Sequence, residues 1–167
     1  FRDNYENAYP ILKKHNAKAT FFMVGENCVK HPDVFQAVKA AGHRLGNHTY
    51  NHWGTLKHSA FAYLRNVEQA NEILHTDLFR PPHGLMFHTH YMAVKHAGYR
   101  VVMWDVVTRD YSRKLNGHDV LHNVRQLARP GSIITFHDSL KSHDKILYAL
   151  PRSIEFLQRE GYEFRLL

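Results

Sequence analysis

Cysteine is almost absent from this chain. Cys28 is the only cysteine among the 167 residues. A single thiol excludes a disulfide bond within the chain, and it also excludes a cluster of thiolates as a metal site. The redox environment in which the protein works therefore stays open.

Long apolar runs and an N-terminal leader are also missing. No window holds the roughly 18 or more consecutive apolar residues that a membrane-spanning helix needs, so we expect no membrane span. No secretory signal is recognisable, and Phe1 is neither an initiator methionine nor a helix cap. We expect the chain to begin inside a domain, and its compartment, cell envelope or cytoplasm, stays unassigned.

Linkers, internal repeats and low-complexity segments are absent from residues 1–167. At 44% hydrophobic residues, a chain of this length can bury one sizeable core. The sequence therefore predicts a single globular domain covering residues 1–167, and it leaves the oligomeric state open.

Acidic residues are fewer than basic ones. The 15 Asp and Glu against 22 Lys and Arg give a formal net charge of +7. Such an excess can indicate nucleic-acid binding, but the basic residues stand singly or in pairs, with no run of five or more. We therefore expect no nucleic-acid partner, and we favour a solvated surface or an acidic glycan.

Helical and extended patterns alternate along the chain, which predicts a parallel α/β arrangement. Strands are expected at 19–24, 44–47, 78–80, 99–104, 132–136 and 162–166. Helices are expected at 5–15, with a possible break at Pro10, and at 32–41, 59–75, 89–97, 118–128 and 146–159. The helix at 59–75 is expected to turn these side chains inward: Phe61, Leu64, Val67, Ile73 and Leu74.

Histidine is abundant, with 15 copies, and most of them lack a partner motif. We expect these at the surface or its boundary: His15, His31, His43, His58, His75, His96, His118 and His122. His48 and His52 differ, because they stand four residues apart directly after an expected strand. In a helical turn such residues share one face, and two imidazoles can supply half of a tetrahedral zinc shell.

Further chemical residues follow this pair in order. They are Arg80-Pro81-Pro82-His83-Gly84, then Asp105 and Asp110, then Phe136-His137-Asp138. His48, Arg80, Asp105 and His137 fall at the carboxyl ends of expected strands, the edge at which (β/α) barrels carry their active sites. A metal, a guanidinium, carboxylates and a further histidine suggest metal-assisted hydrolysis.

With these residues in order, the chain resembles the polysaccharide deacetylases, carbohydrate esterase family 4, over essentially its whole length. His48-Thr49-Tyr50-Asn51-His52 matches the second of five family motifs, and Arg80-Pro81-Pro82-His83-Gly84 matches the third. Residues 104–111 match the fourth, and Thr135-Phe136-His137-Asp138 matches the fifth. The resemblance implies a distorted (β/α)7 barrel, here missing its first strand. It also implies an acetylated glycan as substrate, from which N- or O-acetyl groups are removed, as from N-acetylglucosamine polymers or oligomers.

The resemblance also implies a role for each candidate residue. His48 and His52 would bind a divalent metal ion, most simply Zn²⁺ because imidazole suits it. His137 would protonate the leaving amine, and Asp110 would orient it. Arg80 would lower the pKa of the catalytic base. Three further residues would shape the acetyl and oxyanion sites: His83 through its backbone amide, Trp104 and Phe136.

A structural interpretation stands beside each of these roles. The two histidines could cap a turn, and Arg80 could fix a turn through a backbone carbonyl. His137 could be satisfied by Asp138, and Asp110 could be a solvated loop residue. Trp104 and Phe136 could simply pack in the core.

The chain departs from the family pattern at several points. The first motif, a Thr-Phe-Asp-Asp-Gly strand with the base and a metal-binding aspartate, is not found in residues 1–167. We therefore expect these residues alone to be nearly inactive, with Asp3 a remote substitute. Smaller departures stand at His83, Val107, Tyr111 and Thr135. A non-catalytic glycan- or metal-binding domain on the same barrel remains the alternative function.

Overall fold

The computed structural model describes residues 2–137 and 139–167, and it describes side chains from residue 8 onward in these ranges. The chain forms two compact units: Phe1–Ala19 with Trp104–Leu166, and Thr20–Met103 with Leu167. Each unit carries a parallel sheet and helices, as the alternating pattern predicts. The interpretation of residues 1–167 as one domain stays a prediction.

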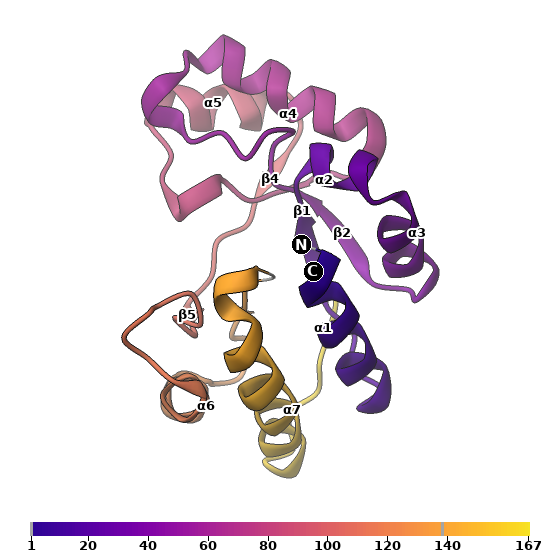
Figure 1. Cartoon of the computed structure of the whole chain (residues 1–167). Helices are drawn as coiled ribbons and strands as arrows, with labels where there is room; N and C mark the ends of the chain where they lie inside the picture. The colour runs from indigo at the N-terminus through magenta and orange to yellow at the C-terminus, as the bar shows by residue number, and fades with distance from the viewer. Residues whose placement is uncertain (1, 138) are drawn as a thin grey trace. The chain divides into compact units, whose positions relative to one another are not determined.

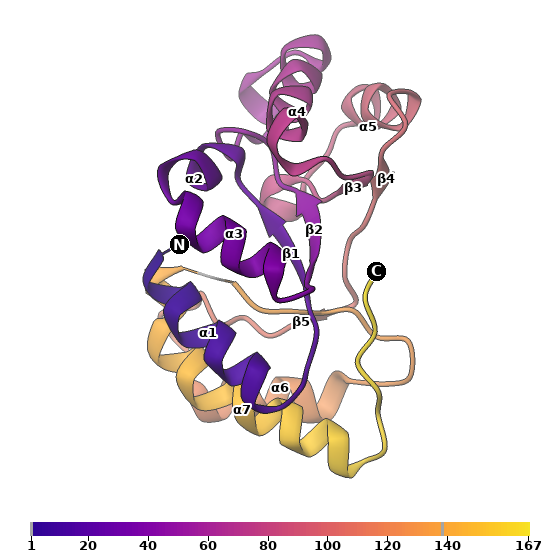
Figure 2. The same cartoon turned by 90° about the vertical axis from the view of Figure 1, so that its right-hand side faces the viewer.

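The unit built on residues 20–103 has a four-stranded sheet in the order β1-β2-β3-β4, with all neighbours parallel (Figures 1 and 2). The strands are β1 Thr20–Met23, β2 Arg44–Asn47, β3 Leu78–Phe79 and β4 Arg100–Val101. The helices are α2 Gly25–Lys30, α3 Pro32–Ala40, α4 Ala60–Leu74 and α5 His88–His96, with the 3₁₀ turns η1 Thr55–Lys57 and η2 Pro82–Gly84. Strand β2 has the predicted bounds, and α2 was not predicted.

Helix α4 shows how the sequence places the core of this unit. Ser59 caps the helix by accepting a hydrogen bond from the Ala62 amide, and His75 ends it in the left-handed conformation. The buried stripe of the helix consists of Tyr63, Asn66, Val67, Ala70 and Leu74. Phe61 was expected inward but is 71% exposed, because it lies two residues before Tyr63 and so on nearly the opposite face.

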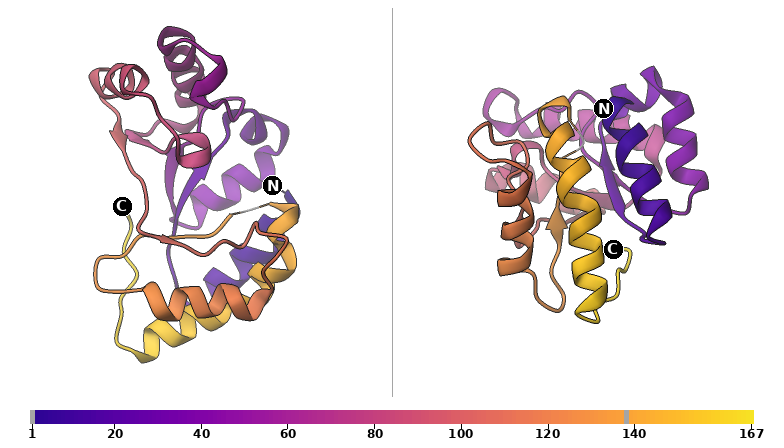
Figure 3. Two further views of the ribbon diagram at one scale, coloured as in Figure 1. Left: turned by 90° about the vertical axis from the view of Figure 1, so that its left-hand side faces the viewer. Right: turned by 60° about the horizontal axis from the view of Figure 1, so that its bottom comes forward.

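The other unit contains α1 Arg2–Lys14, β5 Val106–Val107, α6 Gly117–Leu127, β6 Ile134–Thr135, η3 Leu140–Ser142 and α7 His143–Arg159. Strands β5 and β6 pair in parallel, and α7 packs against both α1 and α6 (Figure 3). Helix α1 runs through Pro10 without a break. The side chain of Asp3, the remote substitute, lies outside the described residues.

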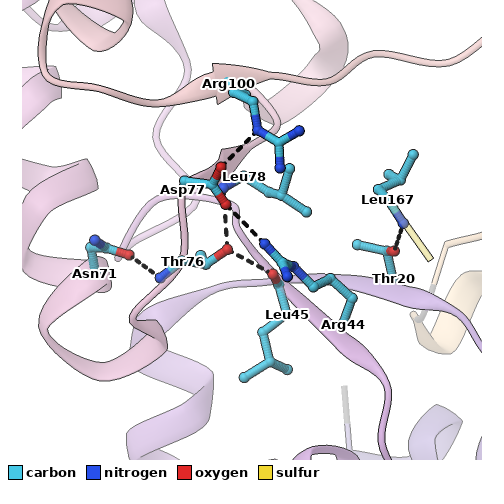
Figure 4. A network of polar contacts seen from close by, with 9 residues as sticks. All are labelled: Thr20, Arg44, Leu45, Asn71, Thr76, Asp77, Leu78, Arg100 and Leu167. Carbon is cyan, nitrogen blue, oxygen red and sulfur yellow. Dashed lines mark hydrogen bonds and ion pairs between the residues drawn. The ribbon is translucent and has the colours of Figure 1, made fainter.

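The strand expected at 162–166 is not formed, and that prediction is wrong. Leu167, the residue after this segment, donates its amide to the Thr20 hydroxyl at 3.3 Å (Figure 4). Among the described residues, no helix is long and apolar enough to span a membrane.

A polar network joins the amino-terminal ends of the β2, β3 and β4 strands (Figure 4). Asp77 accepts from Arg44 at 2.9 Å and from Arg100 at 2.7 Å, and the Thr76 hydroxyl donates to the Leu45 carbonyl at 2.8 Å. The hydrogen bond from Arg100, followed by the other contacts with the two arginines, lowers the pKa of Asp77. This network therefore fixes the amino-terminal ends of these strands, whereas the histidine pair follows the carboxyl end of β2.

Candidate functional site

The histidine pair lies in the loop that follows β2, not on a helical turn. Thr49 and His52 have positive φ angles of 64° and 59°, which interrupt any helix. The prediction of a helical turn is therefore wrong, although the two imidazoles do come together, with ring centroids 5.0 Å apart. A residue other than glycine held at positive φ carries backbone strain, and such strain is common at functional sites.

Two buried asparagines hold this loop. The side chain of Asn47 donates to the Val67 carbonyl at 2.8 Å and accepts from the Thr49 amide at 2.9 Å. Asn66, on the buried stripe of α4, accepts from the Tyr50 amide at 2.9 Å. Sequence reasoning missed both residues. The available signal was a polar side chain placed between Tyr63 and Val67 on an otherwise apolar helix face.

The ring of His48 is fixed by a backbone carbonyl. Its Nδ1 lies 2.7 Å from the carbonyl oxygen of Arg80, which can only accept a hydrogen bond. Nδ1 is therefore the protonated nitrogen, and in the neutral ring Nε2 carries the lone pair. Metal-binding histidines are commonly oriented in this way.

His52 lies between two other imidazoles. Its ring centroid is 5.0 Å from that of His48 and 4.9 Å from that of His83. Desolvation lowers the pKa of His52, and the neighbouring His83 lowers it further. Both effects favour the neutral ring, which is the form that binds a metal.

These two histidines have the chemistry of metal ligands, but they are an incomplete set. Two neutral imidazoles with a defined tautomer at His48 fit a Zn²⁺ ion. Among the side chains that the structure describes, no group of three or more His, Cys, Asp and Glu could hold a metal ion. The residues present therefore fit two positions of a metal shell.

Arg80 is buried at the end of β3. Its guanidinium donates to the carbonyls of Val102 at 3.0 Å and Met103 at 2.8 Å, and it lies 4.1 Å from the centroid of the Phe22 ring. Burial lowers the pKa of Arg80 to about 10, which leaves the side chain charged at neutral pH. These contacts match the turn-fixing role that the sequence left open. They also set a buried positive charge beside the carbonyl that orients His48.

His83 follows the two prolines in η2, with a positive φ of 61°. Its side chain is exposed. Within residues 2–137 and 139–167, its backbone amide donates to no protein acceptor. A free amide beside the histidine pair is the kind of group that can stabilise an oxyanion.

The other unit brings Asp110 and His137 together after β5 and β6. The carboxylate of Asp110 is fully buried; Oδ1 accepts from His137 Nδ1 at 2.8 Å and Oδ2 accepts from the His137 amide at 2.6 Å. Because a carboxylate only accepts a hydrogen bond, Nδ1 carries the proton, and Nε2 is the ring nitrogen that Asp110 does not contact. Lys145 donates to the Asp110 carbonyl at 2.8 Å, and the Tyr111 ring meets the His137 ring edge-on at 4.8 Å.

The two aromatic candidates are only partly buried. Trp104 and Phe136 are half-buried, and Phe136 packs against the cluster of Val120, Leu121 and Ala149. Asp138, the alternative partner of His137, lies outside the described residues.

Asp105 does not belong with the candidate residues at the carboxyl ends of strands. The residue precedes β5, and its carboxylate accepts from the Ile133 amide at 2.7 Å and the Ser132 hydroxyl at 2.9 Å. These bonds, led by the one from Ile133, lower its pKa and fix the turn before β6. The expected strand at 99–104 ends early, at Val101, which is why the prediction for Asp105 is wrong.

One of the histidines expected at the surface or its boundary is buried instead. His43 is 8% exposed and its ring packs edge-on against the Phe21 ring at 5.1 Å. The other seven of that group are exposed or half-buried, as predicted.

The chain belongs to the polysaccharide deacetylase family, whose model matches residues 2–102, more than half of its length. A peptidoglycan-N-acetylglucosamine deacetylase of Bacillus cereus is 31% identical over 160 residues, which cover 92% of this chain and 58% of that relative. A peptidoglycan-N-acetylmuramic acid deacetylase of Bacillus subtilis is 28% identical over 180 residues, covering 99% of this chain and 67% of the relative.

A solved structure confirms the fold. The crystal structure of the Bc1960 peptidoglycan N-acetylglucosamine deacetylase, in complex with 4-naphthalen-1-yl-N-oxidanyl-benzamide, matches with a TM-score of 0.92 and 29% identity. The match covers 98% of this chain and 79% of that one. The predicted class, a distorted α/β barrel of the polysaccharide deacetylase type, is therefore confirmed.

Proposed function

We propose that the chain is the metal-dependent deacetylase domain of an enzyme that hydrolyses N-acetyl groups of an N-acetylglucosamine-containing glycan. Family membership supports the reaction class, and the names of the peptidoglycan deacetylases above point to a cell-wall glycan as substrate. The observation that carries the proposal is the buried Asp110 carboxylate, which holds His137 through both its ring and its amide.

His48 and His52 would hold the metal ion, most simply Zn²⁺, with further ligands from outside the described side chains. When bound, such an ion polarises the acetyl carbonyl and lowers the pKa of a coordinated water toward about 7. The free amide of His83 would hydrogen-bond the developing oxyanion.

His137 would act as the general acid. With the Nδ1 proton engaged by Asp110, Nε2 of the protonated ring is the atom that would pass a proton to the leaving amine. Asp110 would act as a positioning residue, since its two contacts fix the ring and stabilise the imidazolium form. Arg80 would provide a buried positive charge near His48 and hold the carbonyl that orients its ring. Trp104 and Phe136 would shape the acetyl pocket.

The catalytic base is not among the residues that we assign. The family resemblance places it in a Thr-Phe-Asp-Asp-Gly motif that residues 1–167 do not contain. Activity is therefore proposed for the protein when that motif is supplied.

The test is acetate release from N-acetylglucosamine oligomers, measured for residues 1–167 alone and with a Thr-Phe-Asp-Asp-Gly segment placed ahead of Phe1. We expect release with the segment and a rate lower by about 10²-fold or more without it, the usual scale of a lost acid or base. Saturable glycan binding with no release from either protein would instead support the non-catalytic alternative. Equal rates would show that another carboxylate serves as the base.

A further inference from the structure

A polar groove of about 550 Å³ lies between α6 and α7, on helices that carry none of the assigned site residues. The two helices lie side by side (Figure 3). The groove is lined mainly by charged and aromatic side chains: His118, Asp119, His122, Arg125, Tyr148, Arg152, Glu155 and Arg159.

The lining follows helical spacing on both sides. On α6 the residues at 118, 122 and 125 share one face, and on α7 those at 148, 152, 155 and 159 share another. At about 1.5 Å per residue, the stripe on α7 extends for about 16 Å. The groove therefore presents a continuous row of functional groups long enough for an extended chain.

The guanidinium groups of the groove are available to a ligand apart from one donor, because Arg152 Nη1 donates to the Tyr148 carbonyl at 2.9 Å. Arg125, Arg152 and Arg159 are exposed, and among the described residues none of the three forms an ion pair with a carboxylate. Aromatic rings hold two of them in place, since Arg152 lies 4.0 Å from the Tyr148 centroid and Arg125 lies 5.3 Å from the Phe156 centroid.

The acidic residues of the groove are occupied elsewhere. Asp119 accepts from the Asn116 amide at 2.9 Å in the cap of α6. Glu155 lies 3.7 Å from Nε2 of His15, the residue that follows α1. Neither contact removes the negative charge, because the Asn116 amide is neutral and His15 is charged only when protonated. The groove is still positive overall, since three arginines stand against two carboxylates in its lining.

Helices α6 and α7 approach each other closely beside the groove. A Cβ on Gly117 would come within 2.8 Å of the Tyr148 side chain, so only glycine lets the start of α6 approach this ring. The Tyr148 hydroxyl is then 2.9 Å from His118 Nδ1. The aromatic floor and one imidazole of the groove are thus fixed in position.

We propose that the groove between α6 and α7 binds the carboxylate or phosphate groups of an anionic glycan. Guanidinium forks match both anions, and the row of three arginines suits a polymer that carries repeated charges. The choice of a glycan over another polyanion rests on the proposed function, whereas anion binding by the groove does not. The groove would bind an acidic cell-wall polymer through residues that take no part in the proposed reaction.

The test is binding, measured by isothermal titration of the protein with polygalacturonate, a phosphomannan, neutral chitin oligosaccharide, inorganic polyphosphate and duplex DNA. We expect binding of one or both anionic glycans, and the tighter of the two identifies carboxylate or phosphate as the preferred group. Exchange of Arg125, Arg152 and Arg159 for Gln should weaken that binding at least about tenfold and reduce its salt dependence. Because turnover is not measured, this test can fail while the proposed deacetylase activity stands.

Two matched variants control for fold and charge. The triple exchange of the same arginines for Lys keeps the charge but loses the planar fork, so it should bind more weakly than the unmodified protein and more tightly than the Gln variant. A triple exchange of the exposed Lys39, Arg65 and Lys95 for Gln removes the same charge from residues that do not line the groove. It should leave affinity within about threefold, since exposed charges that do not contact the ligand are screened by salt. Failure to bind either glycan, unchanged affinity in the groove variant, or equally tight binding of polyphosphate and DNA would overturn the proposal.

Discussion

His48 and His137 are both oriented through Nδ1, but by acceptors of different charge. The Arg80 carbonyl at 2.7 Å suits a neutral ring, which binds metal ions. The Asp110 carboxylate at 2.8 Å suits a ring that carries a proton, as a general acid does. The two acceptors therefore support different chemical roles for two residues of one type.

Removing the charge of Asp110 should impair proton transfer. Asp110→Asn keeps the size of the side chain but loses the acceptor pair, so acetate release should fall by about 10²-fold or more. Asp110→Asn combined with His137→Ala should lose little more than His137→Ala alone, because the residues act as a unit. The exposed Asp144→Asn is the matched control. Additive losses in the double variant would show that Asp110 does not act through His137.

Gly46 should be intolerant of even a methyl group. A Cβ there would come within 2.5 Å of the Phe22 ring, against which the Arg80 guanidinium packs. Gly46→Ala should therefore lower the free energy of unfolding by about 1–3 kcal/mol, the usual cost of overpacking. Urea denaturation measures the change. Adding Phe22→Ala to Gly46→Ala should relieve the clash, so a double variant whose loss equals the sum of the single losses would contradict this account.

At the scale of the element, the loop at 48–54 and the short strands show what a sequence pattern can specify. Strand β2 was predicted with its observed bounds, because it is followed at once by polar loop residues. The segment 162–166 is richer in apolar and aromatic residues than β2, yet among the described residues it has no ladder partner and remains irregular. Periodicity identifies a segment that can extend, but pairing depends on neighbours distant in the chain.

The loop depends on one side chain from α4. Asn66→Ala would remove the side-chain acceptor shared by the Tyr50 and Asn51 amides, and Tyr50 would keep only its 3.2 Å bond to the Asn66 backbone carbonyl, so the histidine pair would lose its fixed geometry. We expect zinc affinity to fall by about 10–100-fold, the scale seen when outer partners of metal ligands are lost. Calorimetric zinc titration measures this, with the exposed Gln69→Ala of the same helix as control. An equal effect of both variants would assign the loss to helix stability instead.

The network at Asp77 predicts a pH-dependent contribution to stability. Since the folded pKa lies below the unfolded value of about 3.9, the contribution is complete above that value and is lost as pH falls through the lowered folded pKa. The side chain is 46% exposed, so solvent screening limits the effect to about 1 kcal/mol or less. Asp77→Asn should lower unfolding free energy at pH 7 and have little effect near pH 2. Glu72→Gln serves as an exposed control, and a pH-independent difference would contradict the argument.

At the scale of the whole molecule, the chain divides its candidate residues between two units. His48, His52, Arg80 and His83 belong to one unit, and Trp104, Asp110, Phe136 and His137 belong to the other. Ordered motifs predicted both groups and the α/β barrel, because most of them lie at strands that the sequence marks. The fourth motif is the exception, since β5 Val106–Val107 lies inside it and was not predicted. The supporting residues Asn47 and Asn66 were not predicted, since their hydrogen bonds join segments far apart in the chain.

The most direct test of the central claim is acetate release before and after metal removal, using the protein supplied with the Asp-Asp motif. Metal content is followed by elemental analysis, and His48→Ala with His52→Ala serves as the variant that should take up no zinc. The account predicts that chelation abolishes release, that Zn²⁺ restores it in the unmodified protein, and that the variant stays inactive. Unchanged release from protein shown to be free of metal would contradict the account.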